Sequence, residues 1–193
     1  MVVTPRQAAT VVLLRPAAPS PGFEVFLQRR VPTMAFAAGM TVFPGGAWDP
    51  EDVDLRATAV REVREETGIE LDPDDLLPWA RWVTPEGEPR RYDAWFFVAV
   101  LPDGMEPVAV GTEMDHIEWL RPAAALAAVR SGELQMWAPT LVTLRELADC
   151  ADIGAVLATA PLRQFEPVRP KLIQQPDGGT VVELPTGEVF PHG

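Results

Sequence analysis

Apolar and polar residues alternate near the start of the chain in the manner of β-strands. Residues 8–14 (AATVVLL) and 23–29 (FEVFLQR) are rich in β-branched and aromatic side chains, and a proline-rich loop over 16–22 separates them. Residues 79–84 and 92–100 predict two further strands. The last of these (YDAWFFVAV) is nearly all apolar, as expected of a strand buried on both faces in the middle of a sheet.

The segment over residues 55–67 has the boundary residues of a helix. Asp54 precedes it as an N-cap, and Gly68 follows it, where glycine commonly ends a helix. Ala59, Val60 and Val63 predict its buried stripe. The other predicted elements are an irregular segment over 31–42, a turn at 44–46, a short strand over 117–120 and helices over 122–131 and 139–150.

The composition changes from about residue 161, where prolines become frequent. Apolar runs at 170–173 and 180–184 flank Asp177-Gly178-Gly179, which predicts a β-hairpin. We therefore expect one domain over residues 1–160 and an extension over 161–193 that belongs to the same domain or forms a dimer contact. Because exposed strand edges pair readily, a homodimer is expected.

Charge and composition exclude several classes of protein. The formal net charge of −12 argues against a nucleic-acid backbone as the main partner. A single cysteine, Cys150, excludes an intrachain disulfide. The two histidines, His116 in an expected loop and His192 in an expected disordered tail, leave little material for zinc or serine–histidine chemistry. No run approaches the roughly 18 apolar residues of a membrane-spanning helix, and no signal peptide is recognisable, so a cytoplasmic protein without membrane contact is expected.

Three glutamates of the predicted helix indicate a metal site. Glu62 lies three and four residues before Glu65 and Glu66, so all three project to one side. Like charges at this spacing repel. A divalent cation such as Mg²⁺ compensates them well, because it takes oxygen ligands and bridges carboxylates to substrate phosphates. The alternative is a surface helix whose acidic residues are merely solvated.

The run over residues 61–69, with Phe43-Pro44-Gly45-Gly46 upstream, resembles the Nudix box of pyrophosphate hydrolases. The resemblance implies an α/β fold, the Nudix-type α/β/α sandwich with a mixed sheet, followed here by a C-terminal helical and β-hairpin extension. Upstream the chain departs from the family's pattern, because Asp52 stands where glutamate is expected and one extra residue precedes Arg61. The implied ligands of Mg²⁺ or Mn²⁺ are Glu62, Glu65, Glu66, the Gly46 carbonyl and Asp52.

Other residues are candidates for catalysis and for substrate binding. Arg61 is expected to orient the glutamates by paired hydrogen bonds. Glu113 lies in a loop before Trp119 and resembles the base that some Nudix hydrolases carry there; the alternative is a solvated carboxylate. Arginines would contact phosphates or form surface ion pairs, an aromatic ring would stack on a base, and Trp95 is open between that role and the core. The candidate substrate-binding residues are Gly45, Arg29, Arg30, Arg90, Arg91 and Tyr92.

Short blocks such as Met34-Ala35-Phe36 and Trp82-Val83-Thr84-Pro85 resemble the peroxisomal (acyl-)coenzyme A diphosphatase branch of the family. We expect a Mg²⁺-dependent hydrolase that cleaves the pyrophosphate bond of a nucleoside diphosphate linked to another group, with coenzyme A or an acyl-CoA as the leading substrate. The Thr-x-Arg-Ser start and the histidine of that branch's motif are missing, so ADP-ribose and NADH remain alternatives. A non-catalytic nucleotide-binding regulator is the alternative from another class.

Overall fold

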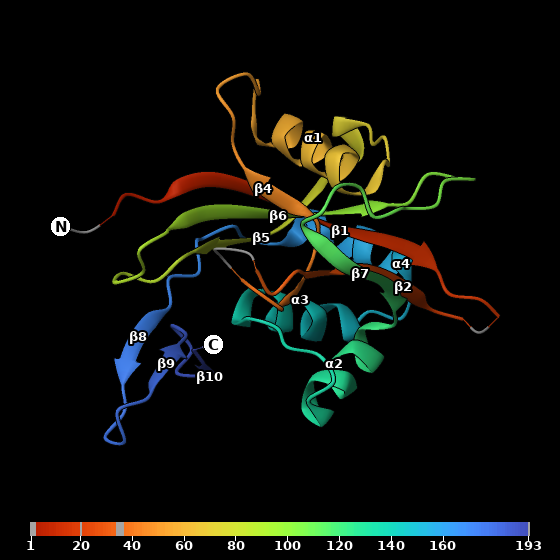
Figure 1. Ribbon diagram of the computed structural model, residues 1–193. Coiled ribbons are helices and arrows are strands. Elements are labelled where there is room, and N and C mark those ends of the chain that lie inside the picture. Colours follow the sequence, from red (N-terminus) through yellow and green to blue (C-terminus); the bar gives the residue numbers. More distant parts are fainter. Residues whose placement is uncertain (1–2, 20, 34–36, 193) are drawn as a thin grey trace.

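A seven-stranded mixed sheet forms the centre of the molecule, and helices cover both of its faces (Figure 1). The computed structural model describes residues 3–19, 21–33 and 37–192, so the predicted Met34-Ala35-Phe36 block lies outside the described residues. The strand order is β3-β2-β1-β6-β5, with β4 paired to β1 and β7 paired to β2. The strands are β1 (Arg6–Pro16), β2 (Phe23–Arg30), β3 (Thr41–Val42), β4 (Gly45–Ala47), β5 (Leu77–Val83), β6 (Tyr92–Val100) and β7 (Met114–Leu120).

Strands β1 and β6 pair in parallel, and every other pair in this sheet is antiparallel. Both strands are buried on both faces because side chains alternate along them. Val11 and Leu13 of β1 pack with the cluster under α1 (Leu55–Thr67), whereas Val12 and Leu14 pack with the cluster on the opposite face, beside α3 (Ala138–Ala148). The α/β fold with a mixed sheet, and the nearly apolar central strand, are confirmed.

Helix α1 begins and ends at the residues that the sequence predicts. The Asp54 carboxylate accepts a hydrogen bond from the Ala57 amide at 2.8 Å, which satisfies one of the free N–H groups of the first turn. Gly68 adopts a left-handed conformation with φ 72° and donates its N–H to the Arg64 carbonyl. Ala59 and Val63 are fully buried against the sheet. Glu62 and Glu66 follow Ala59 and Val63 by three residues, so they lie on the same side of the helix and contact strands β4 and β2.

Several elements differ from the sequence prediction. Gly45 belongs to a strand rather than a turn, because β4 pairs with β1; a Cβ on Gly45 would lie 2.3 Å from the Ala9 carbonyl oxygen. His116 lies in β7 opposite Arg29, since that strand begins three residues earlier than expected. The elements that the sequence did not predict are β3, which lies in the segment expected to be irregular, α4 (Ile153–Thr159), the short 3₁₀ helices η1 (Pro73–Asp75) and η2 (Ala160–Leu162), and β10 (Val189–Pro191). Helix α2 (Pro122–Ser131) has the predicted bounds.

The C-terminal part of the chain forms a second, three-stranded sheet. The predicted hairpin is present as β8 (Lys171–Gln174) and β9 (Thr180–Glu183), and β10 extends it. Before this sheet the chain runs along the edge of β5, where Val168 donates to Arg81 and accepts from Val83 at 2.8 and 2.9 Å. Figure 1 shows the small sheet beside the main one, on the side of α3. No helix within the described ranges is long and apolar enough to cross a membrane.

Candidate functional site

The backbone of β4 and the helix α1 meet at a point where no side chain fits between them. A Cβ on Gly46 would lie 2.5 Å from the carboxyl atoms of Glu62, so only glycine allows this approach. One turn further along α1, the Glu66 carboxylate accepts a hydrogen bond from the Gly45 amide at 2.9 Å. The pairing of β4 with the central strand β1 therefore fixes the glycine backbone against two glutamates of one helix face.

Burial makes both of these carboxylates costly to ionise. Burial raises the pKa of Glu66 to about 7, although hydrogen bonds from Gln28 and Gly45 act in the opposite direction. Burial also raises the pKa of Glu62, and the neighbouring Arg61 partly offsets this. A nearby positive charge would stabilise the ionised form of these two partly desolvated carboxylates.

Arg61 is the centre of an ion-pair network at the edge of this site. Its guanidinium donates to both carboxylate oxygens of Asp52 at 3.0 Å, to Glu62 at 2.9 Å and to Glu65 at 3.2 Å. It also donates to the Ala47 carbonyl of β4 at 3.1 Å. The paired hydrogen bonds expected of Arg61 thus go to Asp52, whose pKa they lower to about 2. Through these hydrogen bonds Arg61 connects α1, β4 and the loop that precedes α1.

Gln28 is a residue of the site that the sequence did not single out. It is buried in β2, and its side-chain amide donates to Glu66 at 2.6 Å. Its Oε1 atom is buried and, among the described residues, has no hydrogen-bond partner. A neutral amide in a strand carries no sequence signal that would distinguish it from other polar strand residues.

The donor set of this site fits a hard divalent cation. It consists of carboxylate oxygens, with the backbone of Gly46 against Glu62, and such oxygens are the ligands that Mg²⁺ prefers. Within the described ranges, however, no three His, Cys, Asp or Glu side chains stand close enough together to hold a metal ion. Glu65 lies toward Arg61 and is half-exposed, and Asp52 is held by Arg61 and Thr58.

A cavity of about 490 Å³ opens beside the glutamates, a volume within the range of small-molecule sites. The predicted site residues that line it are Glu62, Glu66, Glu113, Gly45, Gly46, Arg30, Arg90 and Tyr92. Other predicted residues are absent from its lining, and these are Asp52, Arg61, Glu65, Arg29 and Arg91. The cavity thus joins the glycine strand and two glutamates to three of the predicted substrate-binding side chains.

The arginines predicted to bind phosphate have different surroundings. Arg30, at the end of β2, lies 3.5 Å from Glu113 in the loop before β7, and both candidates line the cavity. Arg29 forms an ion pair with Asp115 at 2.7 Å. Arg91 is buried and donates to the backbone carbonyls of Val3 and Thr84. Its contacts join the N-terminal segment to the loop after β5.

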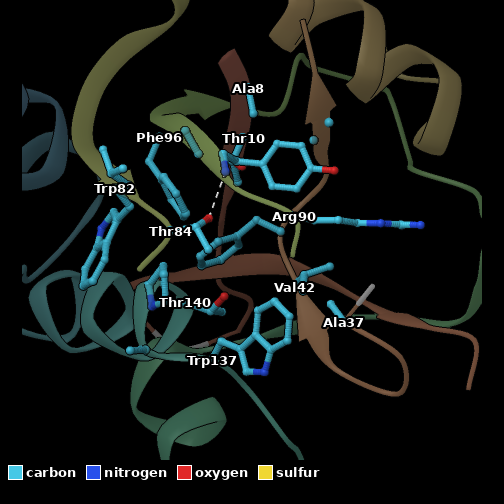
Figure 2. Close-up of a pocket in the computed structure, with 18 of the residues that line it drawn as sticks. Ala8, Thr10, Ala37, Val42, Trp82, Thr84, Arg90, Phe96, Trp137 and Thr140 are labelled. Carbon is cyan, nitrogen blue, oxygen red and sulfur yellow. Dashed lines mark hydrogen bonds between the residues drawn. The ribbon is translucent and has the colours of Figure 1, made fainter. Parts of the chain in front are cut away.

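The cavity continues from the glutamates into an apolar chamber. Figure 2 shows Trp82, Phe96 and Trp137 around Thr84, whose hydroxyl accepts a hydrogen bond from the Tyr92 amide. Trp95, by contrast, packs against Phe97 and Phe165. Because the chamber residues come from β5, β6 and the N-terminus of α3, no local spacing in the sequence could have grouped them.

Comparisons with known proteins identify a domain family and similar structures. Residues 4–139 match the family described as the NUDIX domain. The crystal structure of a NUDIX hydrolase from Alicyclobacillus acidocaldarius resembles this chain with a TM-score of 0.73 and 29% identity. That match covers 81% of this chain and 96% of the other.

Two curated relatives are similar in sequence. A Caenorhabditis elegans protein provisionally named nudix hydrolase 7 is 24% identical over 186 residues, which are 76% of this chain and 62% of the relative. The uncharacterized Nudix hydrolase NudL of Klebsiella pneumoniae strain 342 is 44% identical over 122 residues, which are 63% of this chain and 60% of the relative. The chain thus spans about three fifths of the length of these two relatives.

Proposed function

This chain belongs to the Nudix domain family, and from that premise we propose that it is a Mg²⁺- or Mn²⁺-dependent pyrophosphohydrolase. Its substrate is a nucleoside diphosphate linked to another group. The observation that carries the proposal is the pair of partly desolvated glutamates, Glu62 and Glu66, held against the Gly45-Gly46 backbone at the end of a substrate-sized cavity. Neither a solvated surface helix nor a pure binding site requires this arrangement.

We propose Glu62, Glu65, Glu66 and the Gly46 carbonyl as the cation ligands. The cation would act as a Lewis acid on the diphosphate and lower the pKa of a bound water. Arg61 positions Glu62 and Glu65 through its hydrogen bonds, and Gln28 positions Glu66. Asp52 acts through Arg61, since its oxygens are already hydrogen-bonded to that guanidinium.

Further roles follow from the lining of the cavity. Arg30 and Arg90 are proposed to contact the non-reacting phosphate oxygens, because guanidinium groups pair well with phosphate. Glu113 is proposed as the general base or as an additional ligand, since it lines the same cavity as Glu62 and Glu66. Tyr92 is proposed to contact the base or another ring of the substrate.

Coenzyme A and its acyl esters are the leading proposed substrates, and ADP-ribose and NADH are the alternatives. All of them present the same pyrophosphate to the cation. The domain proposed to carry this activity spans residues 1–160. Residues 161–193 form an extension built onto it, because Leu184 and Phe190 are buried in its core.

The test is to incubate the purified protein with Mg²⁺ or Mn²⁺ and coenzyme A, an acyl-CoA, ADP-ribose, NADH, diadenosine polyphosphates and 8-oxo-dGTP. Mass spectrometry in ¹⁸O-water then identifies the product and the phosphorus that the water attacked. We expect cleavage of at least one member, and a loss of about 10²-fold or more with Glu66→Gln. Glu70→Gln, an exposed glutamate just beyond α1, is the matched control.

Wild-type turnover by Glu65→Gln and Glu66→Gln on every cleaved substrate would contradict the assignment. Tight nucleotide binding without any product in either metal would instead support the regulator.

A further inference from the structure

The far wall of the cavity is built by the C-terminal sheet, which lies outside the residues that match the family. Its lining residues are Pro170, just before β8, Val182 of β9, and Pro191 and His192 at the end of β10. No part of this wall comes from the glutamate helix or the glycine strand. The pyrophosphate end of the cavity and its far wall therefore come from separate parts of the chain.

Several contacts fix this wall in place. Val168 extends the edge of β5 by backbone hydrogen bonds, so the segment leading into the sheet is held at its start. Phe190 is buried in the main core, and Arg145 of α3 pairs with Glu188 while its guanidinium lies over the Phe190 ring. At the end of the chain, the ring of His192 contacts Glu88 at 2.5 Å. The expectation of a disordered tail at His192 is therefore wrong for this residue.

The chemistry of the chamber between the two ends is apolar. Phe43, Trp82 and Phe96 are almost fully buried beneath it, and Val182 faces them from the C-terminal sheet. Among the charged lining side chains, Glu62 and Glu66 lie on α1 and Arg30 pairs with Glu113, whereas Glu88 contacts His192 of the far wall. A diphosphate bound at the glutamates would thus have to direct an apolar group, not a third anionic group, toward the sheet.

We propose that the C-terminal sheet is the specificity wall of the site, and that the substrate is a nucleoside diphosphate whose second group is apolar and reaches Val182. This inference rests on the proposed function, since it takes the diphosphate to lie at Glu62 and Glu66. On this proposal, residues 170–192 discriminate between diphosphate substrates. The Nudix box determines only which bond is cleaved.

Alternation along β9 supplies a matched pair of positions for the test. Val182 lines the cavity and packs against the main core, whereas its neighbour Val181 does neither. Both are valines of intermediate exposure in the same strand. A larger side chain at Val182 shortens the chamber, and the same change at Val181 leaves it unaltered.

The experiment uses P²-alkyl esters of ADP with ethyl, butyl and octyl groups, in which only the length of the apolar group changes. Dissociation constants are measured by calorimetry in Ca²⁺, and kcat/KM is measured in Mg²⁺. For the wild type we expect both affinity and kcat/KM to rise from ethyl to octyl. Each methylene group that becomes buried contributes up to about fourfold.

The variants test whether the C-terminal sheet causes this rise. Val182→Phe is expected to lower the octyl-to-ethyl ratio by about tenfold or more, whereas Val181→Phe keeps the wild-type ratio. If Val182→Phe does not fold, as judged by its circular dichroism and melting curve, Val182→Thr and His192→Ala replace it. The first makes the wall polar and the second removes its contact with Glu88, and both are expected to lower the same ratio.

The outcomes separate the two proposals. A chain-length dependence in binding that Val182→Phe removes supports the specificity wall even if no ester is hydrolysed, in which case only the proposed catalysis fails. Hydrolysis of all esters at equal rates, with equal affinities, overturns the specificity wall and leaves the hydrolase intact. Equal ratios in Val182→Phe and Val181→Phe also overturn it.

Discussion

Because Gly46 contacts Glu62, one added methyl group at Gly46 should lower activity without a comparable loss of stability. In Gly46→Ala the new Cβ would lie 2.5 Å from the carboxyl atoms of Glu62, so the carboxylate must move by about 1 Å to reach ordinary contact. The obstacle is the end of a side chain, which can rotate, and Gly46 does not have a positive φ. We therefore expect unfolding free energy to change by only about 0.5 kcal/mol.

Activity should respond differently because Glu62, a proposed metal ligand, is displaced. A misplacement of about 1 Å at a reacting centre costs on the order of 10²-fold, so kcat/KM of Gly46→Ala should fall by about that factor. The loss should appear equally in Mg²⁺ and Mn²⁺, because it arises from the position of Glu62 rather than from the identity of the cation.

Gly45→Ala is the comparison variant, in which stability is expected to fall. Its Cβ would lie 2.3 Å from the Ala9 carbonyl oxygen and 2.7 Å from the Thr10 Cα, and the backbone of β1 cannot rotate away. Overpacking of this kind costs about 1–3 kcal/mol, and the φ of 154° at Gly45 is rarely adopted by other residues. The melting temperature should fall by about 2–12 °C for a domain of this size.

The assay measures thermal unfolding and turnover of both variants in the same buffer, on whichever substrate of the panel is cleaved. A Gly46→Ala variant with wild-type kcat/KM would refute the reasoning, since Glu62 would then have no required position. A fall in melting temperature as large as that of Gly45→Ala would refute it equally.

Three further predictions concern the fold and the network around the site. Asp54→Ala should cost about 1 kcal/mol of unfolding free energy in urea titrations, because it removes the cap on the Ala57 amide; an unchanged midpoint would contradict this. Hydrogen bonds from Arg81 lower the pKa of Asp93, so Asp93→Asn should lose about 1 kcal/mol at pH 7 after allowance for solvent screening. The stabilisation is present above the ordinary carboxyl pKa and lost as pH falls through the lowered one, so the difference between wild type and variant should shrink in acid. Arg61→Lys should lower kcat/KM by about 10-fold or more, since a lysine cannot reproduce the forked contacts, whereas a stable fold with full activity would remove Arg61 from the site.

The sequence predicted the parts of the fold whose causes are local. Asp54, Gly68 and the apolar stripe lie within one helix length, so the bounds of α1 could be read without knowledge of any other element. The bounds of α2 were predicted for a similar reason, with Pro122 at its first position and Gly132 after its end. Strand β10 was not predicted because three residues are too few to show the alternating pattern of a strand.

Only the glutamate part of the candidate site could be predicted from the sequence. The spacing of Glu62 and Glu66 already places them on one helix face. Which carboxylate an arginine pairs with, however, depends on the tertiary structure. Asp52 and Arg61 became partners because the loop before α1 folds back over the helix. The apolar chamber combines residues from β5, β6, α3 and the C-terminal sheet, and its Val182 lies far in sequence from the box.

The hydrogen bonds of β4 to β1 have a consequence for the timescale on which the site can open. Strand β1 lies between β2 and β6, and its N-terminal half also pairs with β4. Its amides should therefore exchange with solvent only when the whole sheet unfolds. Gly45 and Gly46 are attached to this slowest-opening unit. Glu113 lies on a loop whose backbone meets the sheet through the Val31 amide. Opening of the site to exchange solvent or product should therefore involve the Glu113 loop, while the glycine backbone stays closed until the protein denatures.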